Sequence, residues 1–193
     1  SEYVRLKTLE HEYGKSKMHT FLKYALDRYL RGRKNERKSE TPLMYNNDQA
    51  YIRYSKGALV FYALSDYIGE ENLNTALHTF VAKNKFQGPP YTTTIELVDN
   101  IRAVTPDSLQ YVIKDMFETI TLYDNNMVTY TTTKLDTGAY QVALEFNVSK
   151  YRSDGKGKKI FSDNSIQPLS YQNGSGGSID SLPLADYIDI GIF

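Results

Sequence analysis

The spacing of apolar residues changes near Asp124, and this change constrains the fold more than any other feature of the sequence. Before Asp124, apolar residues recur three and four positions apart, as in amphipathic helices; after it, they alternate with polar residues, as in half-buried antiparallel strands. No internal repeat is present. We therefore expect an α+β chain, with an all-helical lobe over residues 1–122 followed by a small antiparallel β-sandwich over residues 123–193.

Glycines, prolines and capping residues divide the helical lobe into predicted helices. The predicted boundaries are Gly14 after a helix over residues 2–13, Gly69 after a buried helix from about Asn47 to Ile68, the break at Gly88-Pro89-Pro90, a cap at Thr93 or Thr94, and an N-cap at Thr105. Between the boundaries at Gly14 and Gly69, the side chains of Met18, Ala25 and Tyr29 share the apolar face of a further predicted helix. The charged stretch from Arg31 to Lys38 is predicted to be a solvated helix end and exposed loop.

The strand part is predicted from alternation and turn residues. The predicted elements are a strand around 128–132, a turn at Asp136-Thr137-Gly138, a strand from Tyr140 to Val148 with its apolar side chains inward, a hairpin turn at 153–157, a loop over 163–182 and a closing strand over 188–192.

Composition excludes several classes of function. The 193 residues carry 23 basic and 23 acidic side chains, so net charge gives no reason to expect nucleic acid or an anionic membrane as a partner. Cysteine is absent, which rules out disulfides, thiolate metal sites and a cysteine nucleophile. The longest apolar run, Ala58 to Leu64, is far shorter than a membrane span. Because the chain begins with Ser1 inside a helix-like pattern, we expect it to be a piece of a longer protein.

Most residues that could carry chemistry have a simpler interpretation. His11-Glu12 begins like a zinc-binding HExxH motif, but the next histidine, His19, lies eight residues after His11 instead of the four that the motif requires. His78 is predicted to be a surface histidine, and Asp154-Gly155 a plain turn instead of a cation loop. Gly174-Ser175-Gly176-Gly177 lacks the lysine of a phosphate loop, and the glycosylation sequons at Asn147 and Asn173 are expected to be chance matches.

The segment Tyr54-Ser55-Lys56-Gly57-Ala58 is unusual because it places a lysine and a glycine inside an otherwise apolar helix. Glycine there costs about 1 kcal/mol relative to alanine. A purely structural interpretation is that Gly57 permits a close helix crossing, the Lys56 side chain extends to solvent and Tyr54 packs in the core.

In its context this segment resembles the Tyr-x-Lys-Gly-Ala helix of the aminopeptidase-N type of zinc metallopeptidase (gluzincin), the group that includes leukotriene hydrolase. The segment Tyr67-Ile68-Gly69-Glu70-Glu71 and the order of helices then strands are also similar to that family. A closer resemblance is to bacterial peptidase domains joined to an ABC-transporter permease. It is carried by the segments Tyr13-Gly14-Lys15, 26–33, 86–91, 117–124 and the closing 187–193, which together extend over nearly the whole chain.

The resemblance implies one catalytic residue here, Tyr54, whose hydroxyl would donate a hydrogen bond to the oxyanion formed during peptide-bond hydrolysis. Lys56 and Gly57 match the motif and are expected to be structural. The zinc-binding HExxH and the third ligand, a glutamate, have no match in this chain. If Tyr3 is the tyrosine that follows that glutamate in the family, the ligands lie just upstream of Ser1. Zinc is then expected in the parent protein, bound by an upstream domain of the same chain, and no cofactor is expected in this fragment, which alone should be inactive.

These observations support one leading hypothesis and two alternatives. The leading hypothesis is the C-terminal part of a zinc-dependent aminopeptidase-like protein that acts on peptides. The first alternative is a catalytically degenerate peptidase-like sensor or docking domain of an ABC-type transporter, with transporter subunits as partners. The second is an independent ligand-binding module in residues 125–193. We expect the parent to be in the inner membrane of a bacterium, with this region soluble and the side of the membrane undetermined.

Overall fold

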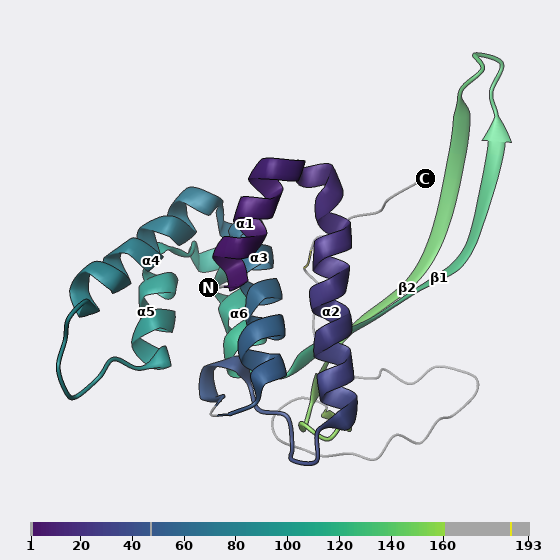
Figure 1. Cartoon of the computed structure of the whole chain (residues 1–193). Coiled ribbons are helices and arrows are strands. Elements are labelled where there is room, and N and C mark those ends of the chain that lie inside the picture. Colours follow the sequence, from purple (N-terminus) through teal and green to yellow (C-terminus); the bar gives the residue numbers. More distant parts are fainter. Residues whose placement is uncertain (1, 47, 161–185, 187–193) are drawn as a thin grey trace. The chain divides into compact units, whose positions relative to one another are not determined.

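The computed structural model describes residues 2–46, 48–160 and 186. The chain forms two compact units, Ser1–Ile120 and Thr121–Phe193, each of which has its own internal contacts. The first unit is helical and the second contains an antiparallel sheet (Figure 1), so the chain has the predicted α+β class.

The helical unit is built from short helical segments joined by tight connections (Figure 1). In chain order they are α1 (Glu2–Tyr13), η1 (Lys15–Lys17), α2 (Met18–Asn35), η2 (Leu43–Tyr45), the π-helix η3 (Tyr51–Lys56), α3 (Gly57–Ile68), α4 (Glu70–Asn84), α5 (Thr94–Val104), η4 (Asp107–Leu109), α6 (Gln110–Ile113) and the π-helix η5 (Lys114–Glu118).

The helix boundaries follow the predicted glycine and capping signals in most places. Gly14 and Gly69 have φ angles of 81° and 86°, which glycine adopts without a steric cost, and they end α1 and α3. Of the two predicted caps, Thr93 and Thr94, it is Thr93 that caps α5, in a capping box with Glu96. The predicted cap at Thr105 is wrong: its buried hydroxyl donates backward to the carbonyl of Ile101 at 2.7 Å, so it closes α5 and does not cap the next helix.

The core of the helical unit lies around α3, which buries residues in two apolar clusters. The larger cluster joins α3 to α1, α4, α5 and the α6–η5 segment through buried residues such as Leu64, Leu73, Ile101 and Phe117. The smaller one is formed by Leu6, Met18 and Ala58. The prediction of a centrally buried helix is therefore confirmed over α3. The turn before α3 is the π-helix η3, which begins at Tyr51. The predicted start at Asn47 lies outside the described residues.

The second unit contains a three-stranded antiparallel sheet of order β1-β2-β3 in its described part. The strands are β1 (Thr121–Lys134), β2 (Tyr140–Ser153) and β3 (Lys159–Ile160), and a bulge between Met127 and Thr129 shifts the β1–β2 register. On β2, Val142, Leu144, Phe146 and Val148 are half-buried and alternate with exposed neighbours as far as Asn147, so the predicted alternation is confirmed there, whereas Tyr140 is exposed.

The two predicted turns of this unit are also confirmed. Leu135 and Ala139 close the β1–β2 hairpin around Gly138, whose φ is 82°. The carboxylate of Asp154 accepts backbone hydrogen bonds from Lys156 and Lys158 at 2.9 and 3.0 Å, and the first of these bonds is the main reason that the pKa of Asp154 is lowered. The described residues form one sheet; the predicted loop over 163–182 and strand over 188–192 lie outside them.

Candidate functional site

Tyr54 lies on the π-helical turn η3 and is exposed over 50% of its surface. A π-helical turn contains more residues than an α-helical turn. The side chains of η3 therefore point in other directions than they would if residues 51–56 were an α-helical extension of α3. The structural interpretation that Tyr54 packs in the core is therefore wrong, and the π-turn accounts for its exposed position. Such turns occur frequently at functional sites.

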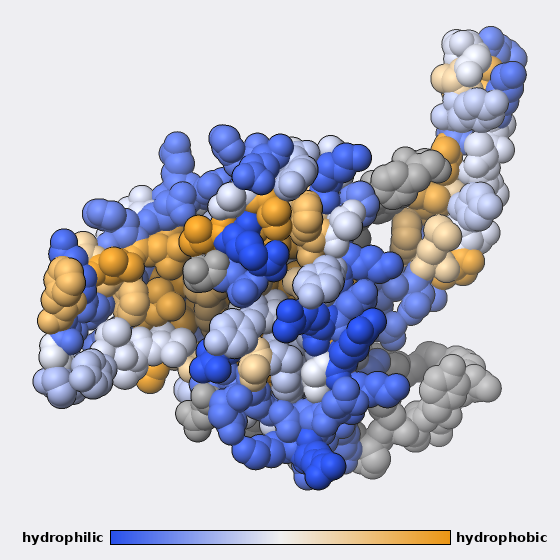
Figure 2. All heavy atoms as spheres, viewed as in Figure 1, coloured by the Kyte–Doolittle hydropathy of each residue, from blue (hydrophilic) through white to orange (hydrophobic). Residues whose placement is uncertain are grey.

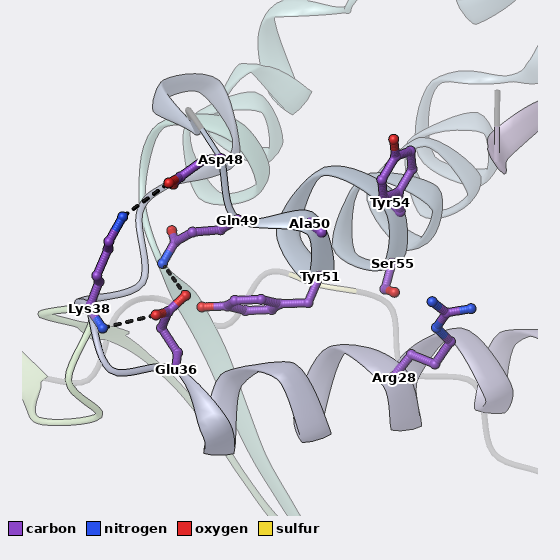
Figure 3. A pocket seen from close by; sticks show the side chains of 9 residues that line it. All are labelled: Arg28, Glu36, Lys38, Asp48, Gln49, Ala50, Tyr51, Tyr54 and Ser55. Atoms are coloured by element: carbon purple, nitrogen blue, oxygen red, sulfur yellow. Dashed lines mark hydrogen bonds and ion pairs between the residues drawn. The ribbon is translucent and has the colours of Figure 1, made fainter.

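The hydroxyl of Tyr54 makes no hydrogen bond with another described residue. The guanidinium carbon of Arg53 lies 4.9 Å from the centre of the Tyr54 ring, which favours one orientation of the ring. Figure 3 shows the Tyr54 side chain directed away from Glu36, whereas the Tyr51 ring extends toward it. Tyr54 therefore offers a hydrogen-bond donor that the other described residues do not use.

Tyr54 borders an apolar groove of about 720 Å³. We call this hollow the apolar groove; its apolar lining includes Leu43, Phe61, Leu77, Phe80, Val81 and Leu97. Gly57 and Ala58 line it next to Tyr54, and Glu2, Tyr3 and Arg5 line it from the first turn of α1. A hollow of this size and composition can hold an extended apolar or mixed ligand, with the Tyr54 hydroxyl at its edge.

A second hollow, of about 440 Å³, also borders η3 and Tyr54 (Figure 3). We call it the polar pocket; it is lined by Arg28, Glu36, Lys38, Asp48, Gln49, Ala50, Tyr51, Tyr54 and Ser55. Its acidic groups are already partnered, because Lys38 pairs with Asp48 at 3.0 Å and Gln49 donates to Glu36 at 2.8 Å. A backbone hydrogen bond from Lys38, followed by the bond from Gln49, lowers the pKa of Glu36.

A buried ionic cluster holds η3 against α2. The carboxylate of Glu40, whose side chain is only 1% exposed, accepts hydrogen bonds from the Lys56 ammonium at 2.9 Å and the Tyr29 hydroxyl at 2.8 Å, and pairs with Arg33 at 2.9 Å. Burial, and next the charge of Glu40, raise the pKa of Tyr29. The prediction that residues 31–38 are simply solvated is wrong at Arg33, because this turn supplies one partner of the cluster.

The purely structural interpretation of the Tyr54 segment is wrong in its details. Lys56 does not extend to solvent but pairs with Glu40 in the interior. A Cβ added at Gly57 would make only ordinary contacts, 3.6 Å from the carbonyl oxygen of Ile52, so this glycine is not required for a close crossing. The close approach is at Gly32, where an added Cβ would lie 2.3 Å from the Cβ of Tyr51.

The histidines do not form a site in the described structure. His11, His19 and His78 are all exposed, which agrees with the prediction for His78, and Nδ1 of His19 lies 3.1 Å from the carbonyl oxygen of Ser16. Within residues 2–46, 48–160 and 186, no three or more histidine, aspartate or glutamate side chains gather where they could bind a metal ion. Gly174–Gly177 and the sequon at Asn173 lie outside the described residues, and Asn147 is exposed on β2.

Tyr3, which the resemblance would put shortly after a zinc ligand if it is the family's tyrosine, lines the apolar groove. Its ring is buried, 5.9 Å from the ring of Phe61, and burial raises the pKa of its hydroxyl. The start of α1 and Tyr54 therefore share one groove although they are about fifty positions apart in the sequence.

Sequence reasoning missed the Glu40 cluster and the polar pocket. Glu40 follows a run of charged residues and precedes Pro42, a context typical of exposed loops, so no local signal marks it as buried. The lysine inside the apolar helix was the one available hint, because a buried lysine requires an acidic partner.

Searches of protein-family models, curated proteins and solved structures find no match to this chain. Among the described residues, no helix has both the length and the apolar composition needed to cross a membrane.

Proposed function

We propose that this chain is the C-terminal part of a zinc-dependent aminopeptidase-like protein, in which Tyr54 stabilises the oxyanion formed during peptide-bond hydrolysis. The described residues do not supply a ligand set for zinc. In this proposal an upstream domain of the same parent chain supplies the metal and the general base, and this chain contributes the wall of the cleft and one hydrogen-bond donor.

The observation that carries the proposal is the position of the Tyr54 hydroxyl. It is the donor of a half-exposed side chain, at the edge of the apolar groove, and the described fold does not use it. The turn η3, which carries Tyr54, is held in place because Lys56, two residues later, forms an ion pair with buried Glu40. A donor on a rigid support can be aimed at charge that develops only in the transition state.

A phenol suits this role for chemical reasons. The hydroxyl of a phenol donates a hydrogen bond without carrying a charge. The apolar groove excludes part of the surrounding water, and a hydrogen bond to a developing oxyanion is stronger in such an environment than in bulk water. The start of α1 lines the same groove, so a segment that precedes α1 is well placed to bring further groups to it.

The test is to express the longer protein with its upstream segment and compare it with its Tyr54→Phe variant. We expect zinc-dependent hydrolysis of aminoacyl anilides, with kcat lower by about 10²–10³ in the variant and zinc content unchanged. Tyr13→Phe is the matched control, because Tyr13 is similarly exposed but lies outside the apolar groove. It should retain full activity.

The other outcomes separate the hypotheses. Activity that is indifferent to Tyr54→Phe would mean that the peptidase assignment holds while the role of Tyr54 is wrong. A longer protein that is folded, free of zinc and inactive would overturn the catalytic proposal and favour the peptidase-like docking domain of a transporter.

A further inference from the structure

The connection between α4 and α5 carries the two most exposed large apolar or aromatic side chains in the described part of the chain. Phe86 is 98% exposed and Tyr91 is 73% exposed. We call residues 83–95, which run from the end of α4 to the start of α5, the aromatic tip. In Figure 1 this connection forms the outer end of the helical unit, away from α2.

The backbone of the aromatic tip holds Phe86 outward. Phe86 is the one non-glycine residue with a positive φ, 63°, among the described residues, a conformation that is rare for an aromatic side chain. The loop is held by hydrogen bonds from the Gln87 backbone to the carbonyl of Asn84 at 3.2 Å and from the Gln87 side chain to the carbonyl of Pro90 at 2.9 Å. An exposed aromatic residue in a strained and internally bonded loop suggests a contact with something outside the chain.

Within the aromatic tip itself the charged side chains are of one sign, although Glu96, the next residue along α5, lies close enough to Lys83 to interact with its charge. No acidic residue occurs from position 72 to 95, while Lys83 and Lys85 are both exposed. The nearest acid along the chain, Glu96, accepts hydrogen bonds from Thr92 and Thr93 in the cap of α5. The chain as a whole is neutral, so its balanced net charge conceals a basic segment from position 72 to 95.

Exposed apolar side chains continue from the tip along the adjacent helix ends. Val81 on α4 and Ile95 on α5 are both exposed. Figure 2 shows apolar surface over the region that α4 occupies in Figure 1, extending to the outer end of the helical unit. Aromatic rings beside lysines are the side chains that favour the interface of a lipid bilayer, where the ring enters the headgroup layer and the ammonium meets anionic lipid.

We propose that the aromatic tip is a docking surface for an anionic lipid bilayer, with Phe86 and Tyr91 entering the headgroup region and Lys83 and Lys85 contacting lipid phosphates. This inference does not depend on the proposed peptidase activity. Two rings and two lysines give weak binding, so the tip orients a protein that approaches the surface and does not anchor it irreversibly.

The absence of tryptophan from the chain allows a direct test. Phe86→Trp places a single fluorophore at the tip. We expect its emission to shift to the blue with vesicles of phosphatidylcholine that contain about 30% phosphatidylglycerol, and not with phosphatidylcholine alone. Tyr45→Trp is the matched control, because Tyr45 is 56% exposed on η2, outside the tip, and its emission should not change.

The charge contribution is tested in the same background. Lys83→Gln and Lys85→Gln should each weaken partitioning about fivefold, whereas Lys23→Gln on the exposed face of α2 should have no effect. Raising the salt concentration to about 1 M should abolish the shift, because the screening length falls to about 3 Å. We also expect the unsubstituted chain to co-sediment with the same vesicles and Phe86→Ser not to do so. This result would show that vesicle binding is not created by the introduced tryptophan.

Three outcomes would overturn the proposal. The first is no shift at the tip with either kind of vesicle, and the second is an equal shift in Tyr45→Trp. The third is a shift that depends on protein concentration without vesicles, which would identify the tip as a contact between two copies of the chain.

Discussion

At the level of single residues, the two glycines that face η3 have opposite roles. Gly32 on α2 is required by a close backbone approach to Tyr51, whereas Gly57 at the start of α3 has room for a methyl group. The sequence drew attention to Gly57, because it interrupts an apolar helix. Gly32 lies among charged residues, and nothing local shows that another segment of the chain comes close to it.

We expect Gly32→Ala to lower the free energy of unfolding by about 1–3 kcal/mol, because the new methyl group would collide with the Cβ of Tyr51, which cannot move without the backbone. The matched variant Gly57→Ala should be neutral or stabilising by up to about 1 kcal/mol, because alanine favours the helix. Urea denaturation of both variants measures the difference. Equal destabilisation by the two substitutions would contradict the assignment.

At the level of elements, the unusual part of the fold is the turn that joins η2 to α3. Its π-helical geometry rotates Tyr54 outward, and the Glu40 cluster ties the following residues to α2. The sequence predicted the helices themselves well, since apolar spacing, glycines and caps are local signals. It did not predict the π-turn, because an α-helical period fitted the same residues and the partner of Lys56 lies sixteen positions away.

We expect Glu40→Ala to destabilise the chain by about 3–5 kcal/mol, since removal of the carboxylate takes the ion-pair partner from the largely buried ammonium of Lys56. Asp48→Ala is the matched control: it breaks the exposed pair with Lys38 and should cost less than about 1 kcal/mol. Thermal and urea unfolding followed by circular dichroism report both values. A loss for Glu40→Ala no larger than that of the control would mean that the cluster adds little to stability.

At the level of the whole molecule, buried tyrosine hydroxyls make the free energy of unfolding depend on pH in the alkaline range. Burial is the main reason that the pKa of Tyr51 and that of Tyr62 are raised to about 12, from 10.0 in the unfolded chain. The Tyr51 hydroxyl is buried without a hydrogen-bond partner among the described residues, next to α2. The folded state therefore favours the neutral phenols.

The sign of the pH dependence follows from these raised values. The contribution of the neutral phenols is complete below about pH 10 and is lost as the pH rises toward 12, since the unfolded chain releases its protons first. We expect the unfolding midpoint in urea to fall over this range, and to fall less in Tyr51→Phe, with Tyr13→Phe as the exposed control. An identical decline in Tyr51→Phe would show that Tyr51 does not contribute.

The sequence by itself determined the class of the fold and most helix and strand boundaries, because apolar period, glycines and caps act over a few neighbouring residues. It also singled out the segment around Tyr54. Tertiary structure alone decided that Glu40 is buried, that Gly32 and not Gly57 allows the close approach, and that Phe86 stands fully exposed. Each of these depends on which distant segments meet or on where the chain faces solvent, and no local pattern of residues encodes that.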